Sequence, residues 1–218
     1  MIRLSEMSTA QMNAPRETRF AELCGTRAMT IIFPNLATDR LLLRPISPQD
    51  LAFVFQHFSD PAVGRFLLDD DLVTTHAESQ AIIDFFIKPG EVTCNRWIIE
   101  RKEDHRPIGT CGYHKWSRRD HRAEIGYDLG PYAWRQGYMS EALKQVASYG
   151  FVDLQLNRIE ALVYPENVAS LKLLERQGFV REGLLRDVLC RDNVYYDHWL
   201  LSLLKREWLL HCQPGAVS

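Results

Sequence analysis

Residues 130–141, which read GPYAWRQGYMSE, decide the fold of this chain. They follow an alternating run at 122–129 that is typical of a strand, and they precede apolar positions at helical spacing over 139–150. A strand that passes through glycine into a helix leaves several backbone N–H groups directed at one point, where the helix dipole favours negative charge. The pattern therefore predicts an anion site, although a glycine before a helix is by itself more often an ordinary turn.

Composition excludes several classes of protein. With 218 residues, of which 46% are hydrophobic, the chain is long enough for one domain with a core and too short for two of ordinary size. The formal net charge of -2 argues against nucleic acid as a partner. Five scattered cysteines without a C-x-x-C pair predict no disulfide framework or zinc site, and they indicate a reducing cytoplasm. No apolar run reaches the ~18 to 20 residues of a membrane span, so we expect no membrane partner.

The two ends of the chain are less regular than its middle. Residues 1–35 are aperiodic, and we expect a flexible extension there, followed by one domain over 36–210 and a frayed tail at 211–218. Better-patterned sequence follows Met29 at once, which suggests the hypothesis that the functional start lies there. A chain begun at Met29 that fails to fold or loses activity would reject it.

The middle of the chain alternates between strand and helix signals. Three successive strands with short polar turns predict an antiparallel meander, and a strand, helix, strand order after it predicts a right-handed crossover with one parallel pair. The predicted fold class is α+β, a mixed and mostly antiparallel sheet flanked by helices, with strands that splay into a cleft where the sheet changes direction. The expected strands are 41–43, 96–101, 107–116, 122–129, 158–163, 179–186 and 195–204, and the expected helices are 47–58, 75–87, 139–153 and 167–176.

Two charged clusters have an ordinary interpretation. Three successive carboxylates at Asp69 to Asp71 could suggest a metal, but nothing nearby offers further ligands at a useful spacing, so we expect a solvated loop and no metal. The turn at 117–121 is basic, and we expect a solvated hairpin tip there rather than a contact with an anionic partner.

Five segments carry a resemblance to a known family. They read TDRLLLRPISPQD, PIGTCGY, AEIGYDLGPYAWRQGYMSEAL, LNRIEALVYPENVASLKLLERQGFVREGLLRD and YYDHWLLSLLKREW, and in order they span about 38–208. Together they resemble the GNAT superfamily of acyl-coenzyme A dependent N-acyltransferases. Within it they are similar to the RimJ/RimL branch, which acetylates N-terminal amines of ribosomal proteins. The resemblance implies the GNAT fold, acetyl-CoA as co-substrate and direct acetyl transfer to an amine in a ternary complex.

The resemblance identifies the opening stretch as a phosphate loop. The family pattern is (Q/R)-x-x-G-x-(G/A); Gly137 holds its central glycine, whereas Trp134 and Met139 depart from its flanking positions. Arg135 also replaces a glycine that is common in this branch. Because backbone N–H groups do the binding, these substitutions need not abolish it.

The family also implies which residues hold the co-substrate. The backbone of Asp128 and Leu129 should pair with the pantetheine arm in the manner of an added strand. The pyrophosphate should lie on the amides of the loop and the first helical turn, beside Arg135; the residues concerned are Trp134, Gln136, Gly137, Tyr138, Met139 and Ser140.

Acetyl transfer from a thioester needs a neutral amine, a polarised carbonyl and a proton for the departing thiolate. Glu124 is the candidate base, since the resemblance places it in the cleft and partial burial raises a carboxylate pKa. The alternative is an ordinary strand carboxylate paired with Arg122 or another basic group.

The usual proton donor of the family is missing, because many family members carry a tyrosine where this chain has Leu174. Ser170 lies four residues earlier on the same helical face, and in this branch such a serine reaches the coenzyme A sulfur. Ser170 is therefore the candidate proton donor or hydrogen-bond partner of the sulfur. Asn167 caps its helix and could also contact the pantetheine, and Tyr164 is a second candidate donor or a packing aromatic.

The acceptor is the least defined part of the prediction. An α-amine, with a pKa of ~8, needs less help from a weak base than a lysine at ~10.4, which favours a protein or peptide N-terminus. Small amines such as polyamines, aminoglycosides or amino-acid-like compounds are the alternative, since fold alone does not choose between them. A non-catalytic acyl-CoA sensor is more remote. We expect a monomer or a homodimer joined through the closing strands.

Overall fold

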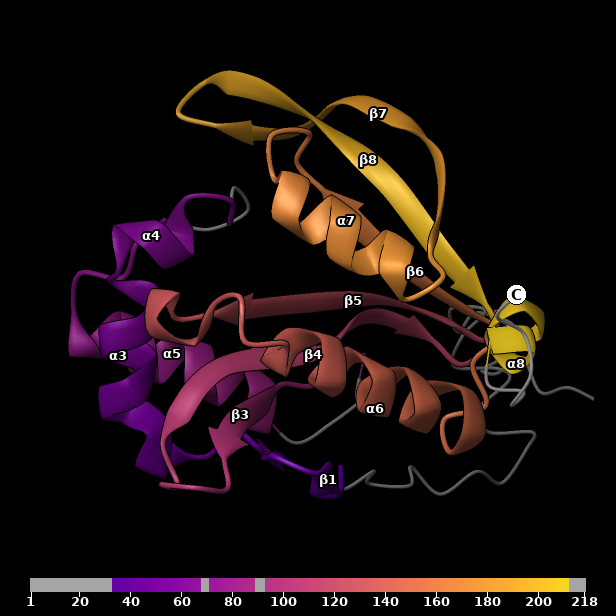
Figure 1. The fold of residues 1–218 in the computed structure, drawn as a ribbon. Coiled ribbons are helices and arrows are strands. Elements are labelled where there is room, and N and C mark those ends of the chain that lie inside the picture. Colours follow the sequence, from indigo (N-terminus) through magenta and orange to yellow (C-terminus); the bar gives the residue numbers. More distant parts are fainter. Residues whose placement is uncertain (1–32, 68–70, 89–92, 212–218) are drawn as a thin grey trace, which may run out of the picture. The chain divides into compact units, whose positions relative to one another are not determined.

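The computed structural model describes residues 33–67, 71–88 and 93–211, and these residues form an eight-stranded sheet flanked by helices (Figure 1). The strands lie in the order β1-β2-β3-β4-β5-β6-β8-β7. Their bounds are β1 Leu36–Ala37, β2 Leu41–Pro45, β3 Trp97–Arg101, β4 Pro107–Ser117, β5 Arg122–Leu129, β6 Arg158–Val163, β7 Val180–Arg191 and β8 Val194–Leu204. The predicted α+β class and the mixed, mostly antiparallel sheet are confirmed.

The helices begin where the sequence supplies caps. Thr75 and Glu78 form a capping box at the start of α5, and the Asn167 side chain accepts from the Ser170 amide at the start of α7. Gly178, two residues after the end of α7, adopts φ of 88°, the left-handed conformation that commonly follows a helix C-terminus. The α-helices are α3 Leu51–Phe58, α4 Pro61–Gly64, α5 His76–Ile87, α6 Tyr138–Val152, α7 Val168–Arg176 and α8 Lys205–His211, and the 3-10 helices are η2 Pro48–Asp50 and η3 Pro131–Ala133.

Two pairs of helices cover opposite faces of the sheet. On β4, Tyr113 donates to the Val146 carbonyl of α6, whereas the next residue, His114, contacts Phe86 of α5. Because successive side chains of a strand point to opposite faces, α6 lies on one face and α5 on the other. The same alternation holds on β5. Tyr127 contacts α7, which therefore lies on the face of α6, and Asp128 contacts α3, which lies on the face of α5.

Most element boundaries agree with the sequence to within two residues, and the larger differences have local causes. The connection between the predicted strands 179–186 and 195–204 is shorter in the structure, because Asp192 and Asn193 both adopt positive φ and let β7 continue to Arg191. Strand β1, helix α4 and helix α8 were not predicted, since each is short. Phe33, placed by prediction in the extension, packs on Trp97 with ring centroids 5.5 Å apart. The hypothesis about Met29 lies outside the described residues.

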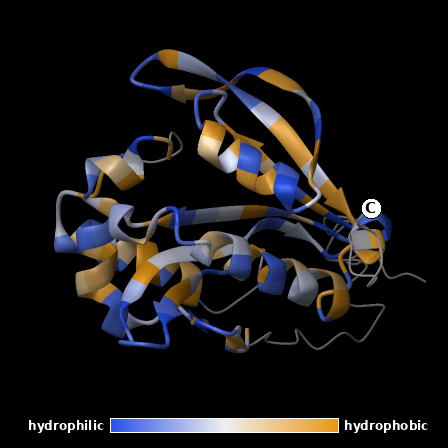
Figure 2. Ribbon diagram, viewed as in Figure 1, coloured by the Kyte–Doolittle hydropathy of each residue, from blue (hydrophilic) through white to orange (hydrophobic). Residues whose placement is uncertain are grey.

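Strand β7 is one edge of the sheet, and much of it is exposed. Figure 2 shows apolar segments alternating with polar ones along the hairpin of β7 and β8. A bulge between Leu185 and Leu189 interrupts the pairing, and Asp187 adopts positive φ within it. A bulge of this kind protects an edge against addition of another strand. A second register shift, between Arg181 and Gly183, interrupts the first part of β7, so little of this edge is regular enough to pair with a second copy.

Candidate functional site

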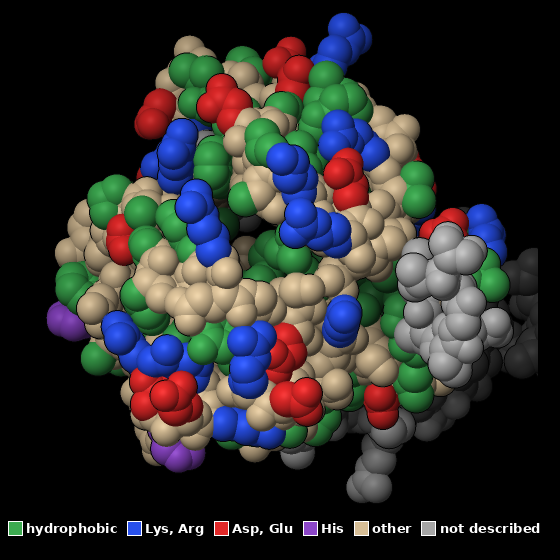
Figure 3. All heavy atoms as spheres, in the orientation of Figure 1, with side chains coloured by type: hydrophobic (Ala, Val, Ile, Leu, Met, Phe, Trp, Pro, Cys, Tyr) green, Lys and Arg blue, Asp and Glu red, His purple; other side chains and the backbone are tan. Residues whose placement is uncertain are grey.

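The two parallel strands of the sheet separate soon after they meet. Strands β5 and β6 pair in parallel at Arg122↔Arg158, Ala123↔Ile159 and Glu124↔Glu160, and the described residues show no pairing between them beyond that point. Strand β5 continues beside β4, and β6 continues beside β8. Figure 3 shows a hollow in the corresponding part of the surface, with Lys and Arg side chains around its rim. The predicted splay at the crossover is thus present, and its surroundings suit an anionic molecule.

The loop 130–137 connects the end of β5 to helix α6. The N-cap of α6 is Gly137, with φ of 81°, and Arg135 two residues earlier also has positive φ, 59°. This backbone turns the loop sharply, so that the N–H groups of the first helical turn lie at the loop without helical partners. Tyr138 and Met139 are buried under the loop, while Gln136 and Arg135 are exposed. The glycine and the helix start that the sequence predicts here are present, and this backbone geometry is the one that anion sites at helix N-termini use.

Arg40 of the segment before β2 contacts the loop and the first turn of α6, a role that no sequence pattern indicated. Its Nη1 donates to the Gln136 carbonyl at 3.0 Å, and its Nε pairs with Glu141 at 2.7 Å. Its guanidinium also lies over the Tyr138 ring, 4.6 Å from the centroid. Burial acts to raise the pKa of Glu141, but bonds from Thr38 and Arg40 outweigh it and lower that pKa, so the carboxylate stays ionised. Only the pairing of distant segments reveals this contact.

The strand side of the loop is fixed by two side chains. Trp134 Nε1 donates to the Leu129 carbonyl at 2.7 Å, and Gln136 Nε2 donates to the Tyr132 carbonyl at 2.8 Å. The Trp134 indole thus ties the loop to the end of β5 by a hydrogen bond, although the family pattern has Gln or Arg at this position. The Leu129 carbonyl accepts this one bond, and its second lone pair remains for a ligand.

Asp128 has a partner that no sequence pattern indicated. Its carboxylate is buried, lies 2.5 Å from His57 Nε2 of α3, and accepts from the Thr110 hydroxyl at 2.7 Å. Burial acts to raise the pKa of Asp128, but the charge and bonds of His57 and the bond from Thr110 lower it overall. The side chain is therefore committed to the sheet and to α3 and is not available to a ligand.

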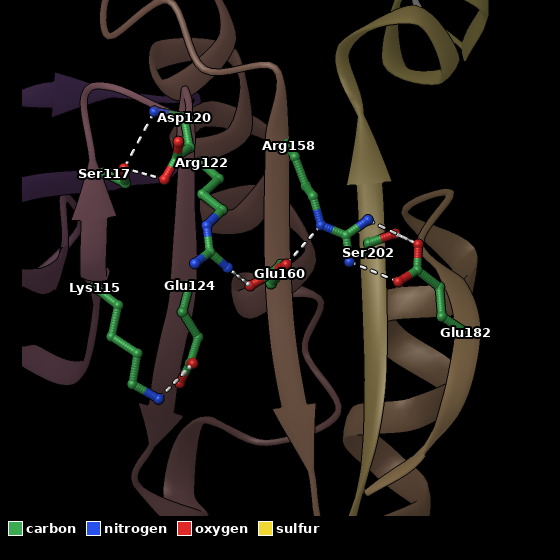
Figure 4. Close-up of polar contacts among 9 residues, drawn as sticks. All are labelled: Lys115, Ser117, Asp120, Arg122, Glu124, Arg158, Glu160, Glu182 and Ser202. Carbon is green, nitrogen blue, oxygen red and sulfur yellow. Dashed lines mark hydrogen bonds and ion pairs between the residues drawn. The ribbon is translucent and has the colours of Figure 1, made fainter.

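Glu124 lies on the narrow part of the cleft, on the same face of the sheet as Asp128. Its carboxylate pairs with Lys115 Nζ at 2.9 Å rather than with Arg122 (Figure 4). Arg122 pairs instead with Glu160 on the neighbouring strand, at 3.4 Å. Lys115 is 71% exposed, so this ion pair is worth less than ~1 kcal/mol and can open at little cost.

Ser170 lies on the opposite face, in the first turn of α7. Its Oγ is 2.6 Å from the Tyr127 hydroxyl, and its amide donates to Asn167 Oδ1 at 3.1 Å, so the predicted cap is present. Ser140 of α6 accepts a bond of 2.6 Å from Gln177, just after α7. These contacts join β5 to the first turn of α7, and the first turn of α6 to the residue that follows α7. The two candidate catalytic residues, Glu124 and Ser170, thus approach the cleft from opposite faces of the sheet.

The remaining candidates are placed in packed surroundings. Tyr164 contacts Phe66 and Tyr196, with ring centroids 6.3 and 5.7 Å away, which supports the packing interpretation. Leu174 is fully buried. Of the three carboxylates at 69–71 only Asp71 is described, and it pairs with Arg191 at 3.3 Å. Within 33–67, 71–88 and 93–211, no group of three His, Cys, Asp or Glu side chains could hold a metal, and no helix could cross a membrane.

Comparison with known proteins identifies this arrangement. The family model of the acetyltransferase (GNAT) domain matches residues 40–180, which include the loop, the splayed strands and α7. The chain belongs to the GNAT acetyltransferase family. Its GNAT relatives include the uncharacterized N-acetyltransferase YoaA of Bacillus subtilis (strain 168), 39% identical, and p20 of Bacillus licheniformis, 42% identical. Each of these matches covers 80% of this chain and 98% of the relative. The protein is therefore an N-acetyltransferase, an acyltransferase of a family that uses acetyl-CoA.

Further similar proteins include two whose names state different acceptors. The [ribosomal protein uS5]-alanine N-acetyltransferase of Escherichia coli (strain K12) is 35% identical over 40% of this chain and 45% of its own length. A GNAT acetyltransferase structure from Bacillus anthracis has a TM-score of 0.70 and 26% identity, over 80% of this chain and all of its own. The spermidine N-acetyltransferase of Vibrio cholerae, solved with CoA and spermine, has a TM-score of 0.71 at 21% identity, over 79% of this chain and 99% of its own. The last likeness concerns the fold alone.

Proposed function

We propose that this GNAT protein moves the acetyl group of acetyl-CoA directly to the α-amine of a protein or peptide N-terminus, as a member of the RimJ/RimL branch. The observation that carries the proposal is the separation of β5 from β6 directly after Glu124 and Glu160. An acyl donor laid along β5 would reach the sheet from the face of α6 and α7, while an amine would arrive from the face of Glu124. Attack then takes place through the opening in the sheet.

Acetyl-CoA fits the residues that surround the cleft. The pyrophosphate would lie on the amides of 136–140, where the left-handed Gly137 leaves the loop open and the α6 dipole favours an anion. Arg135 would add a positive charge at the loop, and the backbone of β5 at Asp128 and Leu129 would pair with the pantetheine amides. Asn167 would add an amide contact from the start of α7.

Glu124 acts on the amine and Ser170 on the sulfur. Glu124 takes the proton that the amine loses, directly or through a water, after its weak pair with Lys115 opens. Ser170 donates a hydrogen bond to the sulfur as the carbon–sulfur bond breaks and keeps its own proton. The sulfur leaves as a thiolate and takes a proton from water, so one proton leaves the amine, one reaches the sulfur and no net proton is consumed.

The charges near Glu124 support an α-amine over a polycation. Glu124, Glu160 and Glu182 already have Lys or Arg partners (Figure 4). The Arg158 guanidinium lowers the pKa of Glu182 to about 2, so this pair persists at neutral pH. A polyamine would have to compete with these cations for each carboxylate, whereas a single α-amine needs only Glu124.

The test is release of free CoA thiol from acetyl-CoA with a panel of acceptors. The panel holds peptides beginning with Ser or Ala, the same peptides blocked at the N-terminus but carrying a lysine, polyamines, and aminoglycosides. We expect turnover only with free N-termini, and a fall of about 100-fold or more in kcat for Glu124→Gln. Glu160→Gln is the matched control, because Glu160 is the neighbouring ion-paired carboxylate on the same face, and it should retain activity.

Other results would redirect the proposal. Turnover with polyamines or aminoglycosides alone would replace the N-terminal acceptor by a small amine. Tight acetyl-CoA binding without turnover on any amine would favour an acyl-CoA sensor. The cytoplasm is the proposed location, since Cys94, Cys111 and Cys190 are all free thiols.

A further inference from the structure

Two hydroxyl groups, those of Tyr127 and Ser170, form a short contact beside the cleft that has no role in the proposed function so far. The Tyr127 phenol comes from β5, beyond the point where β5 and β6 separate, and the Ser170 hydroxyl comes from α7. Their oxygens are 2.6 Å apart. The pair thus links the strand on one side of the opening to the helix that follows the strand on the other side.

Each hydroxyl can donate one hydrogen and accept two, so the direction of this bond decides what Ser170 can do. A phenol is a stronger acid than an aliphatic alcohol, which makes Tyr127 the better donor of the two. Burial raises the pKa of the Tyr127 phenol well above its ordinary value, although the Ser170 bond acts in the opposite direction. Tyr127 therefore keeps its hydrogen at any physiological pH and has it available to donate.

The serine hydrogen is then left for another acceptor. A serine within a helix often donates to a carbonyl one turn earlier, but in the part of the chain that the structure describes Ser170 has no such bond. Its amide is held by Asn167, which fixes the first turn of α7 and with it the position of Oγ. With one lone pair engaged by Tyr127, the remaining freedom of the Ser170 O–H is restricted to directions away from the phenol.

We propose that Tyr127 is a positioning residue that acts through Ser170: its phenol donates to Ser170 Oγ and thereby directs the serine O–H at the sulfur of bound CoA. The inference rests on the proposed function for the placement of CoA along β5. In the transfer, the amine nitrogen forms a bond to the acetyl carbon and the carbon–sulfur bond breaks with its electron pair on sulfur. The thiolate leaves with the Ser170 hydrogen bond on its sulfur, Ser170 and Tyr127 both keep their own protons, and the sulfur then takes a proton from water.

The decisive measurement is the pKa of the CoA thiol bound to the enzyme, followed by the ultraviolet absorbance of the thiolate in a pH titration without any amine. A directed hydroxyl stabilises the thiolate, so we expect the wild type to bind CoA with a thiol pKa about one unit below that of the Tyr127→Phe variant. Ser170→Ala should raise the thiol pKa by as much, and the double variant should raise it no further, because both changes remove the same hydrogen bond.

The matched control is Tyr113→Phe. It also removes a buried tyrosine hydroxyl from the same face of the sheet, one that donates to the Val146 carbonyl at 2.8 Å, and it should leave the pKa of bound CoA unchanged. In turnover, Tyr127→Phe should lower kcat about tenfold with the KM for acetyl-CoA within about twofold.

The outcomes separate this inference from the function on which it rests. Failure of the wild type to bind CoA would overturn both. Binding with a thiol pKa that Tyr127→Phe does not shift, or additive effects in the double variant, would overturn the role of Tyr127 alone. A shifted thiol pKa in an enzyme that acetylates no amine of the panel would support the hydroxyl pair and contradict the proposed acceptor.

Discussion

At the residue scale, the backbone of Gly137 determines whether the loop can present its amides. A Cβ added there would meet only Arg40 Nη2 at 3.4 Å, an ordinary contact, so space is not the constraint. The constraint is φ of 81°, a left-handed conformation that costs a residue with a Cβ about 1 to 2 kcal/mol. The glycine is therefore required by conformation rather than by close packing.

We expect Gly137→Ala to weaken CoA binding about tenfold, because about 1.4 kcal/mol of strain falls on the binding conformation. Titration calorimetry with CoA measures it. Gly183→Ala is the control, since a Cβ at Gly183 meets nothing within 4 Å and the backbone there is not left-handed. Equal affinity in the two variants would show that the loop does not bind in this conformation.

The buried pair of Asp128 and His57 has a different role, since it fastens α3 to β5. Its carboxyl pKa is lowered in the folded chain from an ordinary value of 3.8. Below 3.8 the unfolded chain binds more protons than the folded one, so this contribution to stability is complete above that pH and is lost as the pH falls further.

We therefore expect the free energy of unfolding to fall more steeply below about pH 4 in the wild type than in Asp128→Asn. At pH 7 the variant should be less stable by about 3 kcal/mol, because it leaves a buried pair broken. Urea unfolding at several pH values measures both effects, and His57→Gln should reduce the same pH dependence. Parallel pH curves for the wild type and Asp128→Asn would contradict the assignment.

At the element scale, α7 shows how one residue can serve both a helix and a site. Asn167 accepts the Ser170 amide and so completes the first turn, while its own NH₂ group remains for a ligand. Stability and binding can therefore be separated by choice of substitution.

We expect Asn167→Ala to lower the free energy of unfolding by about 1 kcal/mol, because the cap is lost. Asn167→Asp should keep the cap and stay within a few tenths of the wild-type value. If the amide also contacts the pantetheine, both variants should raise the Kd for CoA. Weakened binding in Asn167→Ala alone would assign the residue to capping only, and denaturant unfolding with CoA titration distinguishes these results.

At the scale of the whole molecule, the proposed ligand joins elements that are far apart in the chain. A CoA molecule in the cleft would contact β5, the loop before α6 and the start of α7, each of which belongs to a different part of the sequence. Any ligand that binds only the folded state stabilises it by mass action.

CoA at 100 times its Kd should add about 2.7 kcal/mol to the free energy of unfolding. The midpoint of thermal unfolding should rise with CoA concentration in the wild type, and Gly137→Ala should need about ten times more ligand for the same rise. A midpoint that does not change with millimolar CoA would exclude binding to the cleft.

The sequence alone determined the order of the longer elements, the fold class, the glycine at the loop and the caps of α5 and α7. Those features depend on neighbours along the chain: periodicity, a cap three residues ahead, a glycine before a helix. The tertiary structure alone decided the partners of Glu124, the burial of Asp128 against His57, the support of the loop by Arg40, and the Tyr127 and Ser170 pair. These contacts join residues between 9 and 101 positions apart. Side chains so far apart meet only when the sheet and its helices have packed, and no local pattern records that meeting.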